Sequence, residues 1–178
     1  NHVIRMDPDN HLALNNLGTH YKDTLGAPAR AIPYYDRAIR VKPDSPGTWY
    51  NRGQARERIG DTDGAIEDYT AAIRLQPEHG KAYTNRGVLR QRRGDLDGAA
   101  ADYGAALRID PRSFAAHINR AGLHARQGDL LSAEMHYLRA LELAPADWSG
   151  VDRVRKVIKN IQRRLKAPQN AESTPMQE

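Results

Sequence analysis

A period of about 34 residues is the feature that most constrains the fold of this chain, which has 178 residues. The prolines Pro8, Pro43, Pro77, Pro111 and Pro145 follow one another at a nearly constant interval, which is one position longer in the first copy. Such spacing predicts one supersecondary unit repeated along the chain. The composition, with 28% charged and 39% hydrophobic residues, likewise does not favour a compact single-core enzyme.

Other residue types keep the same register through four copies. The columns are Gly18, Gly53, Gly87 and Ala121; Ala31, Ala65, Ala99 and Ala133; Tyr35, Tyr69, Tyr103 and Tyr137; and Ala38, Ala72, Ala106 and Ala140. Within a copy the apolar spacing is helical, as in the run from Ala65 to Ile73. The small residues let two helices approach closely and the tyrosine fills the space between them. No helix pair buries its apolar face alone, so the copies are expected to stack.

A glycine–aspartate pair divides each of the last three copies into two helices. The pairs are Gly60-Asp61, Gly94-Asp95 and Gly128-Asp129. Glycine suits the left-handed position after one helix, and aspartate suits the N-terminal side of the next. The first copy carries one extra residue in its turn, where Pro28 fits the first turn of the second helix, and the insertion should be absorbed locally.

These motifs resemble the tetratricopeptide repeat: an aromatic (Trp49, Tyr83), then Asn-Arg-Gly, Ala-Ile, a further aromatic, Ala-Ile or Ala-Leu, and proline. The resemblance covers residues 11–145. It implies an all-α fold, a right-handed superhelical α-solenoid of stacked antiparallel helix pairs. The expected repeats are residues 11–43, 44–77, 78–111 and 112–145.

The two ends of the array differ from the repeats. Residues 1–8 fit the end of a preceding repeat, so we expect at least one more repeat upstream. Residues 147–166 carry one apolar stripe on a basic helix, which predicts a cap for the last repeat. Residues 151–166 hold seven cations and one aspartate, so this helix has a net charge of 7 − 1 = +6, against +5 for the whole chain. Residues 167–178 lack an apolar period and are expected to be a disordered tail.

Three copies carry arginine where the family often has leucine. These residues are Arg52, Arg86 and Arg120, against Leu17 in the first copy. Asp68 and Asp102 precede the tyrosine column in two of those three copies. This coincidence predicts structural Arg–Asp bridges within or between neighbouring copies.

One asparagine per copy is the most regular candidate for binding. Asn16, Asn51, Asn85 and Asn119 stand two residues before the glycine column. The resemblance implies that first helices line the concave face, and that a carboxamide ladder there can grip the main chain of a peptide. The alternative is that each asparagine bonds a neighbouring helix and sets the repeat geometry. The two roles are compatible.

Cations near the ends of the first helices complete the candidate peptide-binding set. Arg58, Arg92 and Arg126 recur once per copy, and Tyr50 and Lys81 are additional candidates. If these arginines face the groove, they favour an acidic ligand. Some members of the family clamp the carboxylate tails of heat-shock chaperones. Only part of that clamp matches this sequence, which disfavours chaperone-tail binding.

The sequence favours an interaction scaffold that binds a protein or peptide and needs no cofactor. The chain has no cysteine, its seven histidines lack metal-ligand spacing, and no phosphate-binding glycine loop occurs. Two alternatives stay open. The chain could be the interaction module of a larger enzyme such as a transferase, or it could bind RNA or an anionic surface through residues 151–166. The compartment stays open between the cytoplasm and export.

Overall fold

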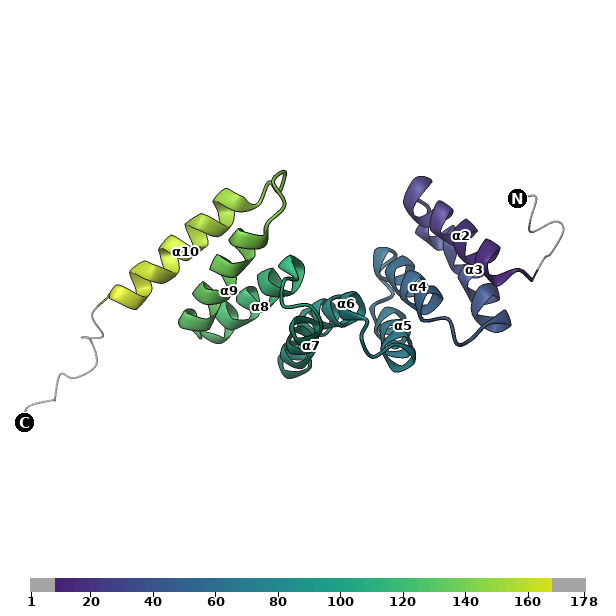
Figure 1. Cartoon of the computed structure of the whole chain (residues 1–178), viewed down its shortest axis with the longest axis horizontal. Helices are drawn as coiled ribbons and strands as arrows, with labels where there is room; N and C mark the ends of the chain where they lie inside the picture. Colours follow the sequence, from purple (N-terminus) through teal and green to yellow (C-terminus); the bar gives the residue numbers. More distant parts are fainter. Residues whose placement is uncertain (1–8, 168–178) are drawn as a thin grey trace, which may run out of the picture. The chain divides into compact units, whose positions relative to one another are not determined.

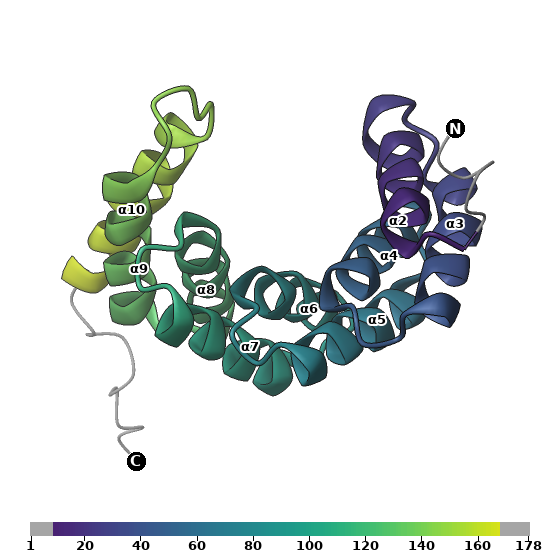
Figure 2. The same cartoon turned by 45° about the vertical axis from the view of Figure 1, so that its right-hand side comes forward.

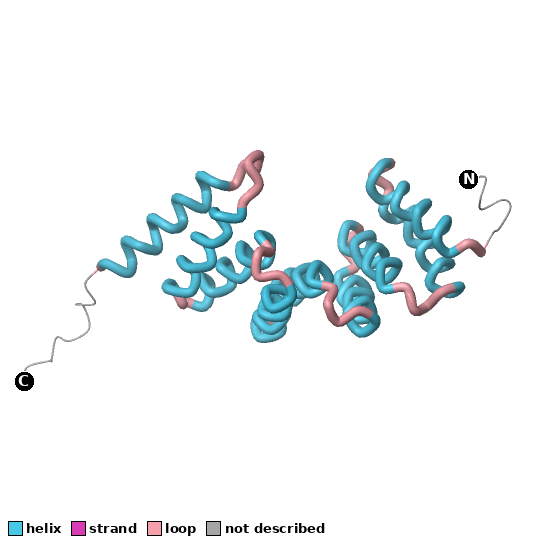
Figure 3. Tube along the Cα trace, in the orientation of Figure 1, coloured by secondary structure: helices cyan, strands magenta, loops and turns pink. Residues whose placement is uncertain are grey.

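The computed structural model describes residues 9–167, and in that range the regular structure is entirely helical (Figure 3). The helices are α2 (His11–Thr19), η1 (His20–Thr24), α3 (Pro28–Val41), α4 (Pro46–Arg58), α5 (Thr62–Leu75), α6 (Gly80–Arg92), α7 (Leu96–Ile109), α8 (Phe114–Gln127), α9 (Leu130–Leu143) and α10 (Val151–Lys166). None of the helices described is long and apolar enough to cross a membrane. The expected upstream repeat end, residues 1–8, and all but the first residue of the expected tail lie outside the described residues.

Helices adjacent in sequence pack as antiparallel pairs, one pair per predicted repeat (Figure 1). The chain divides into two units, one containing α2 to α7 and the other α8 to α10. In the first unit, the first helices α2, α4 and α6 follow one side and the second helices α3, α5 and α7 follow the other (Figure 2). In the second unit, α10 packs against α9. The stacked pairs and the cap confirm the predicted fold class.

The turn chemistry behaves as the sequence predicts. Gly60, Gly94 and Gly128 have φ angles of 85°, 86° and 81°, a region that suits glycine because it has no Cβ. The aspartate after each of them caps the next helix, as Asp61 Oδ1 accepts from the Gly64 amide at 3.0 Å. Each second helix of the repeats ends two residues before the periodic proline.

The extra residue of the first copy is absorbed at the end of its first helix. Residues His20–Thr24 form one π-helical turn directly after α2. Such single turns accommodate one inserted residue within a helix. Gly26 then supplies a positive φ of 59°, and Pro28 opens α3. The insertion is therefore local, as expected, but it lies mainly in the helix rather than in the connecting turn.

The glycine and tyrosine columns meet inside each repeat of the first unit. A Cβ on Gly87 would lie 2.7 Å from Cε1 of Tyr103, and the corresponding distance from Gly53 to Tyr69 is 2.9 Å. Tyr69 and Tyr103 are fully buried. The glycines thus allow a tyrosine ring to lie directly against the first helix, which explains why these two columns recur together.

The capping helix begins at Val151, later than the predicted boundary at residue 147. Trp148 lies before the helix in a turn, where its amide donates to the Pro145 carbonyl at 3.0 Å. Its ring lies over Gly150 and contacts Phe114 edge-on, with 4.7 Å between the ring centroids. Val154, Ile158 and Ile161 form the buried stripe of α10. Trp148 therefore contributes to the predicted apolar stripe from outside the helix.

Candidate peptide-binding face

A chain of side-chain hydrogen bonds joins the first helices of the first unit. Asn51 on α4 donates to the Asn15 carboxamide on α2 at 3.1 Å. Asn85 on α6 donates to the Tyr50 hydroxyl on α4 at 3.3 Å and to the Tyr69 hydroxyl on α5 at 3.4 Å. Two of the four predicted asparagines therefore bridge neighbouring helices. We refer to these polar side chains of α2, α4 and α6 as the first-helix seam.

The seam continues toward the C-terminal ends of the same helices. Lys22 on η1 is 3% exposed and donates to Gln54 at 2.6 Å, and Gln54 in turn donates to Tyr50 at 3.1 Å. Burial lowers the pKa of Lys22, and the neighbouring Asp23 carboxylate opposes that shift. Lys22 therefore serves the packing between repeats and is not open to a ligand.

Two members of the arginine column pair with carboxylates of the preceding repeat. Arg58 forms an ion pair with Asp23 at 2.9 Å and donates to the Lys22 carbonyl at 2.7 Å. Arg92 lies 3.5 Å from Glu57. These arginines keep 48% and 64% of their side-chain surface exposed. They retain donors for an anionic ligand, but their charge is partly balanced within the protein.

Tyr69 adds a neutral donor to the seam. Burial is the main reason that the pKa of its hydroxyl is raised, and the Glu57 carboxylate, which accepts from it at 2.9 Å, adds to the effect. The hydroxyl thus stays protonated and holds Glu57 in place. Burial also raises the pKa of Tyr50. These tyrosines fix the positions of Asn85 and Glu57.

The remaining predicted residues lie in different places. Lys81 is exposed near the start of α6 and Asn16 is exposed on α2. Asn119 is half-buried and Arg126 is exposed, both on α8 of the second unit. In the first unit the structure joins Asn51, Asn85 and Tyr50 into one hydrogen-bonded seam with Arg58 and Arg92 at its edge.

Several members of the seam were not predicted from the sequence. Asn15 and Gln54 carry bonds between α2 and α4, and Tyr69 reaches the seam from the second helix of its repeat. No column of identical residues marks these positions, because Asn15, Tyr50 and Thr84 occupy the same column. The available signal was polar character at this column in α2, α4 and α6.

The predicted Arg–Asp bridges are present and lie within a repeat. Arg52 donates to both carboxylate oxygens of Asp68, at 2.9 and 2.7 Å, and Arg86 binds Asp102 in the same way at 3.0 and 2.7 Å. Arg52 also reaches Asp36 of the preceding repeat at 2.6 Å. Bidentate geometry and nearly complete burial of both aspartates make these pairs structural.

The fourth repeat replaces this ion pair with histidines. His136 stands in the aspartate column, and its Nδ1 lies 2.9 Å from Nδ1 of His117 on α8. The His124 ring stacks on the His136 ring with 5.6 Å between centroids. Arg120 contacts His124 at 3.4 Å instead of a carboxylate. Burial, aided by Arg120 and the two other histidines, lowers the pKa of His136 to about 4. These side chains do not form a metal-binding group among the described residues.

Comparison with known families assigns the class of the protein. Tetratricopeptide repeat models match residues 26–84, and also residues 2–46 together with 84–147. The chain therefore belongs to the tetratricopeptide repeat family, whose repeats are modules for interaction between proteins.

Solved structures with the same fold include the crystal structure of MamA, with 27% identity and a TM-score of 0.74 over 79% of this chain and 82% of that one. A tetratricopeptide repeat protein from Parabacteroides merdae has 24% identity and a TM-score of 0.74, over 90% of this chain and 63% of that one. The first TPR of Spaghetti (RPAP3), bound to the HSP90 peptide SRMEEVD, has 22% identity and a TM-score of 0.62, over 68% of this chain and 94% of that one. Among curated proteins, none matches this sequence.

Proposed function

We propose that this protein is a scaffold or adaptor that binds an extended segment of a partner protein along the first-helix seam of α2, α4 and α6. The observation that carries the proposal is the placement of Asn85. The Asn85 amide nitrogen donates to the hydroxyls of Tyr50 and Tyr69, while its carboxamide oxygen receives no hydrogen bond from any described residue. That oxygen can accept from a peptide N–H, so a role in repeat geometry and a role in binding are compatible.

The charge around the seam favours a mildly acidic segment. Its cations are Lys22, Arg58, Lys81 and Arg92, against the carboxylates Asp23 and Glu57, which gives 4 − 2 = +2. Lys22 is buried, so the cations that can meet a ligand are Lys81 and the partly paired Arg58 and Arg92. A hydrogen bond contributes roughly 1 kcal/mol, so a short peptide should bind with an affinity in the micromolar range.

The neighbour that binds an HSP90 peptide supports peptide binding on this fold. Transfer of its ligand to this chain is disfavoured by the residues present. The family's carboxylate clamp requires a lysine, an asparagine and an arginine where this chain has Asn15, Thr19 and Asn85. Asn15 and Asn85 are moreover engaged with neighbouring helices. The proposed ligand is therefore an internal acidic segment rather than a chaperone tail.

Fluorescence titration with an array of extended peptides tests the proposal. The array should contain acidic peptides, their lysine-substituted copies, and free and amidated C-termini. We expect acidic peptides to bind, with about a tenfold loss of affinity for a protein carrying Lys81→Ala and Arg92→Ala together. Binding of basic and acidic peptides with equal affinity would contradict the proposed ligand class.

A control variant and a test of folding separate binding from stability. Arg108→Ala removes an exposed arginine from the second helix α7 and should leave binding unchanged. Asn85→Ala should weaken binding, and circular dichroism must show that the variant keeps its helices, because Asn85 also bridges α4 to α6. If the Asn51, Asn85 and Asn119 variants are all folded and bind the acidic peptides as the parent does, the asparagines are not the binding surface.

A further inference from the structure

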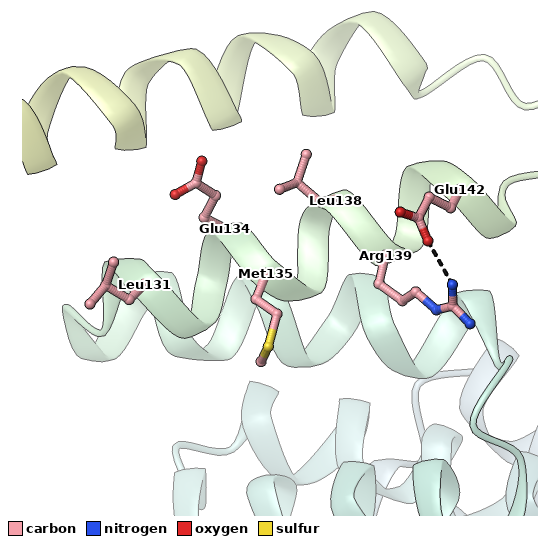
Figure 4. Close-up of a pocket in the computed structure, with 6 residues that line it drawn as sticks. All are labelled: Leu131, Glu134, Met135, Leu138, Arg139 and Glu142. Atoms are coloured by element: carbon pink, nitrogen blue, oxygen red, sulfur yellow. Dashed lines mark hydrogen bonds and ion pairs between the residues drawn. The ribbon is translucent and has the colours of Figure 1, made fainter.

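The outer face of α9 carries an exposed apolar stripe that the other second helices lack. Leu131, Met135 and Leu138 are exposed to 70%, 58% and 45%. They follow one another at i, i+4 and i+7, so they lie on one side of the helix. Figure 4 shows these side chains with Glu134, Arg139 and Glu142 around an open depression. We call these six residues the α9 stripe.

The internal repeat shows that the stripe is not required by the fold. At the column of Leu131 the second and third repeats have Asp63 and Asp97, and at the column of Met135 they have Glu67 and Ala101. At the column of Leu138 they have Thr70 and Gly104. The same helix position therefore accepts small or charged residues in two copies of one chain. A cluster of large exposed apolar residues in a single copy marks an interaction surface.

One edge of the stripe is bordered by cations of the capping helix. Gln162 on α10 donates to Glu134 of the stripe at 2.6 Å, which fixes the side of α10 that meets the stripe. Arg155, Lys159 and Lys166 lie at helical spacing from Gln162, so they share that side. All three are exposed. Arg155 has only a 3.6 Å contact with the exposed Asp152, which leaves its charge available to a partner.

From this juxtaposition we infer that the α9 stripe and the Arg155–Lys159–Lys166 row bind an amphipathic helix of a partner protein that carries an acidic edge. The stripe extends along α9 from Leu131 to Glu142, a length of roughly 16 Å, which corresponds to about three turns of a docked helix. The apolar face of that helix covers Leu131, Met135 and Leu138. Its carboxylates lie against the cation row, which sets the orientation and the selectivity.

Other occupants fit the surface less well. A second copy of this chain brings a second basic α10, so like charges would meet at the interface. An anionic membrane surface would face the carboxylates Glu134 and Glu142 inside the stripe, which would repel it. A helix with apolar and acidic faces complements both the depression and the cations. This surface is separate from the first-helix seam.

The probe for this site is a designed helical peptide about four turns long, with leucines at i, i+4 and i+7 and a row of glutamates along one edge. A copy with lysine in place of each glutamate is the control peptide. Fluorescence anisotropy measures binding of both to the full chain. We expect the glutamate peptide to bind at least about tenfold more tightly than the lysine peptide.

Two sets of variants locate the binding. Leu131→Asp with Met135→Ala introduces the residues that the third repeat has at those columns, so the fold should tolerate them, and affinity should fall at least about tenfold. Arg155→Glu with Lys159→Glu should weaken binding comparably. Arg153→Glu with Lys156→Glu makes the same charge change outside the cation row and should change affinity no more than about twofold.

Several results would overturn the inference. These are absence of binding by the glutamate peptide, equal binding by the Leu131→Asp and Met135→Ala protein, or equal effects of the two charge-reversal pairs. If sedimentation shows that the parent chain is a dimer and that the Leu131→Asp and Met135→Ala variant is a monomer, the stripe binds a second copy of the chain. Stripe-dependent binding to phosphatidylserine vesicles would assign it to a membrane surface. Lys81→Ala should leave peptide binding here unchanged, which keeps this test independent of the seam.

Discussion

The third and fourth repeats place different side chains at the same columns of the period. In the third, Gly87 lets the Tyr103 ring pack fully buried, and Arg86 binds Asp102 with two hydrogen bonds. In the fourth, Ala121 replaces the glycine, Tyr137 is only half-buried, and His136 replaces the aspartate. The same backbone motif thus contains a buried ion pair in one repeat and a buried histidine contact in the other. The period therefore fixes the positions of the helices but not the side-chain chemistry between them.

Breaking the ion pair of the third repeat should have the largest effect. Asp102→Ala leaves Arg86 and Arg90, which both contact that carboxylate, without their buried partner. We expect a loss of about 3–5 kcal/mol in the free energy of unfolding, because an uncompensated buried charge is costly. Urea unfolding followed by circular dichroism measures it. Glu78→Ala, an exposed carboxylate in the preceding loop, is the control and should change little.

The histidines of the fourth repeat should make it sensitive to acid. The pKa of His136 is about 4 in the folded protein, below the ordinary value of 6.5, so the unfolded chain binds a proton first as the pH falls. The contribution of the neutral imidazole is complete above pH 6.5 and is lost as the pH falls from there toward 4. The loss should be on the order of 2–3 kcal/mol. Unfolding curves measured at intervals between pH 7.5 and about 4 follow it.

His136→Asp provides the reciprocal test, since it restores the residue of the aspartate column beside Arg120. The loss of stability between pH 6.5 and 4 should then disappear, because His136, the group whose titration causes it, is no longer present. An unchanged pH profile in this variant would show that His136 is not the group that titrates. His20→Asn, on the exposed part of η1, serves as the control.

The glycine column should give the smallest effect of the three. Gly87→Ala places a methyl group 2.7 Å from the Tyr103 ring, so the ring must shift. We expect a net loss of about 1–2 kcal/mol, since overpacking outweighs the better helix propensity of alanine. In the fourth repeat, Ala121→Gly should lose about 1 kcal/mol through helix propensity alone. A gain in stability from Gly87→Ala would refute the packing explanation of the column.

The sequence alone determined the repeat, the helix pairs and the turns. These features depend on local chemistry that recurs with the period: glycine at a positive φ, aspartate at a helix start, and proline after a helix end. The Arg–Asp pairing could also be predicted, because the aspartate occurs in two of the three copies that carry the arginine and is missing from the copy with Leu17. The candidate residues Asn51, Asn85, Arg58 and Arg92 were identified because the same residue type recurs at their columns.

Only the tertiary structure decided what those side chains contact. In the folded protein Asn51 donates a hydrogen bond to Asn15, and Asn85 donates to two tyrosines. The extra residue of the first repeat lies in a π-helical turn. The tertiary structure also placed the cations of α10 beside the apolar stripe of α9 through the bond from Gln162 to Glu134. The physical reason is that these contacts join separate helices, and their distances depend on the packing of side chains that the period does not encode.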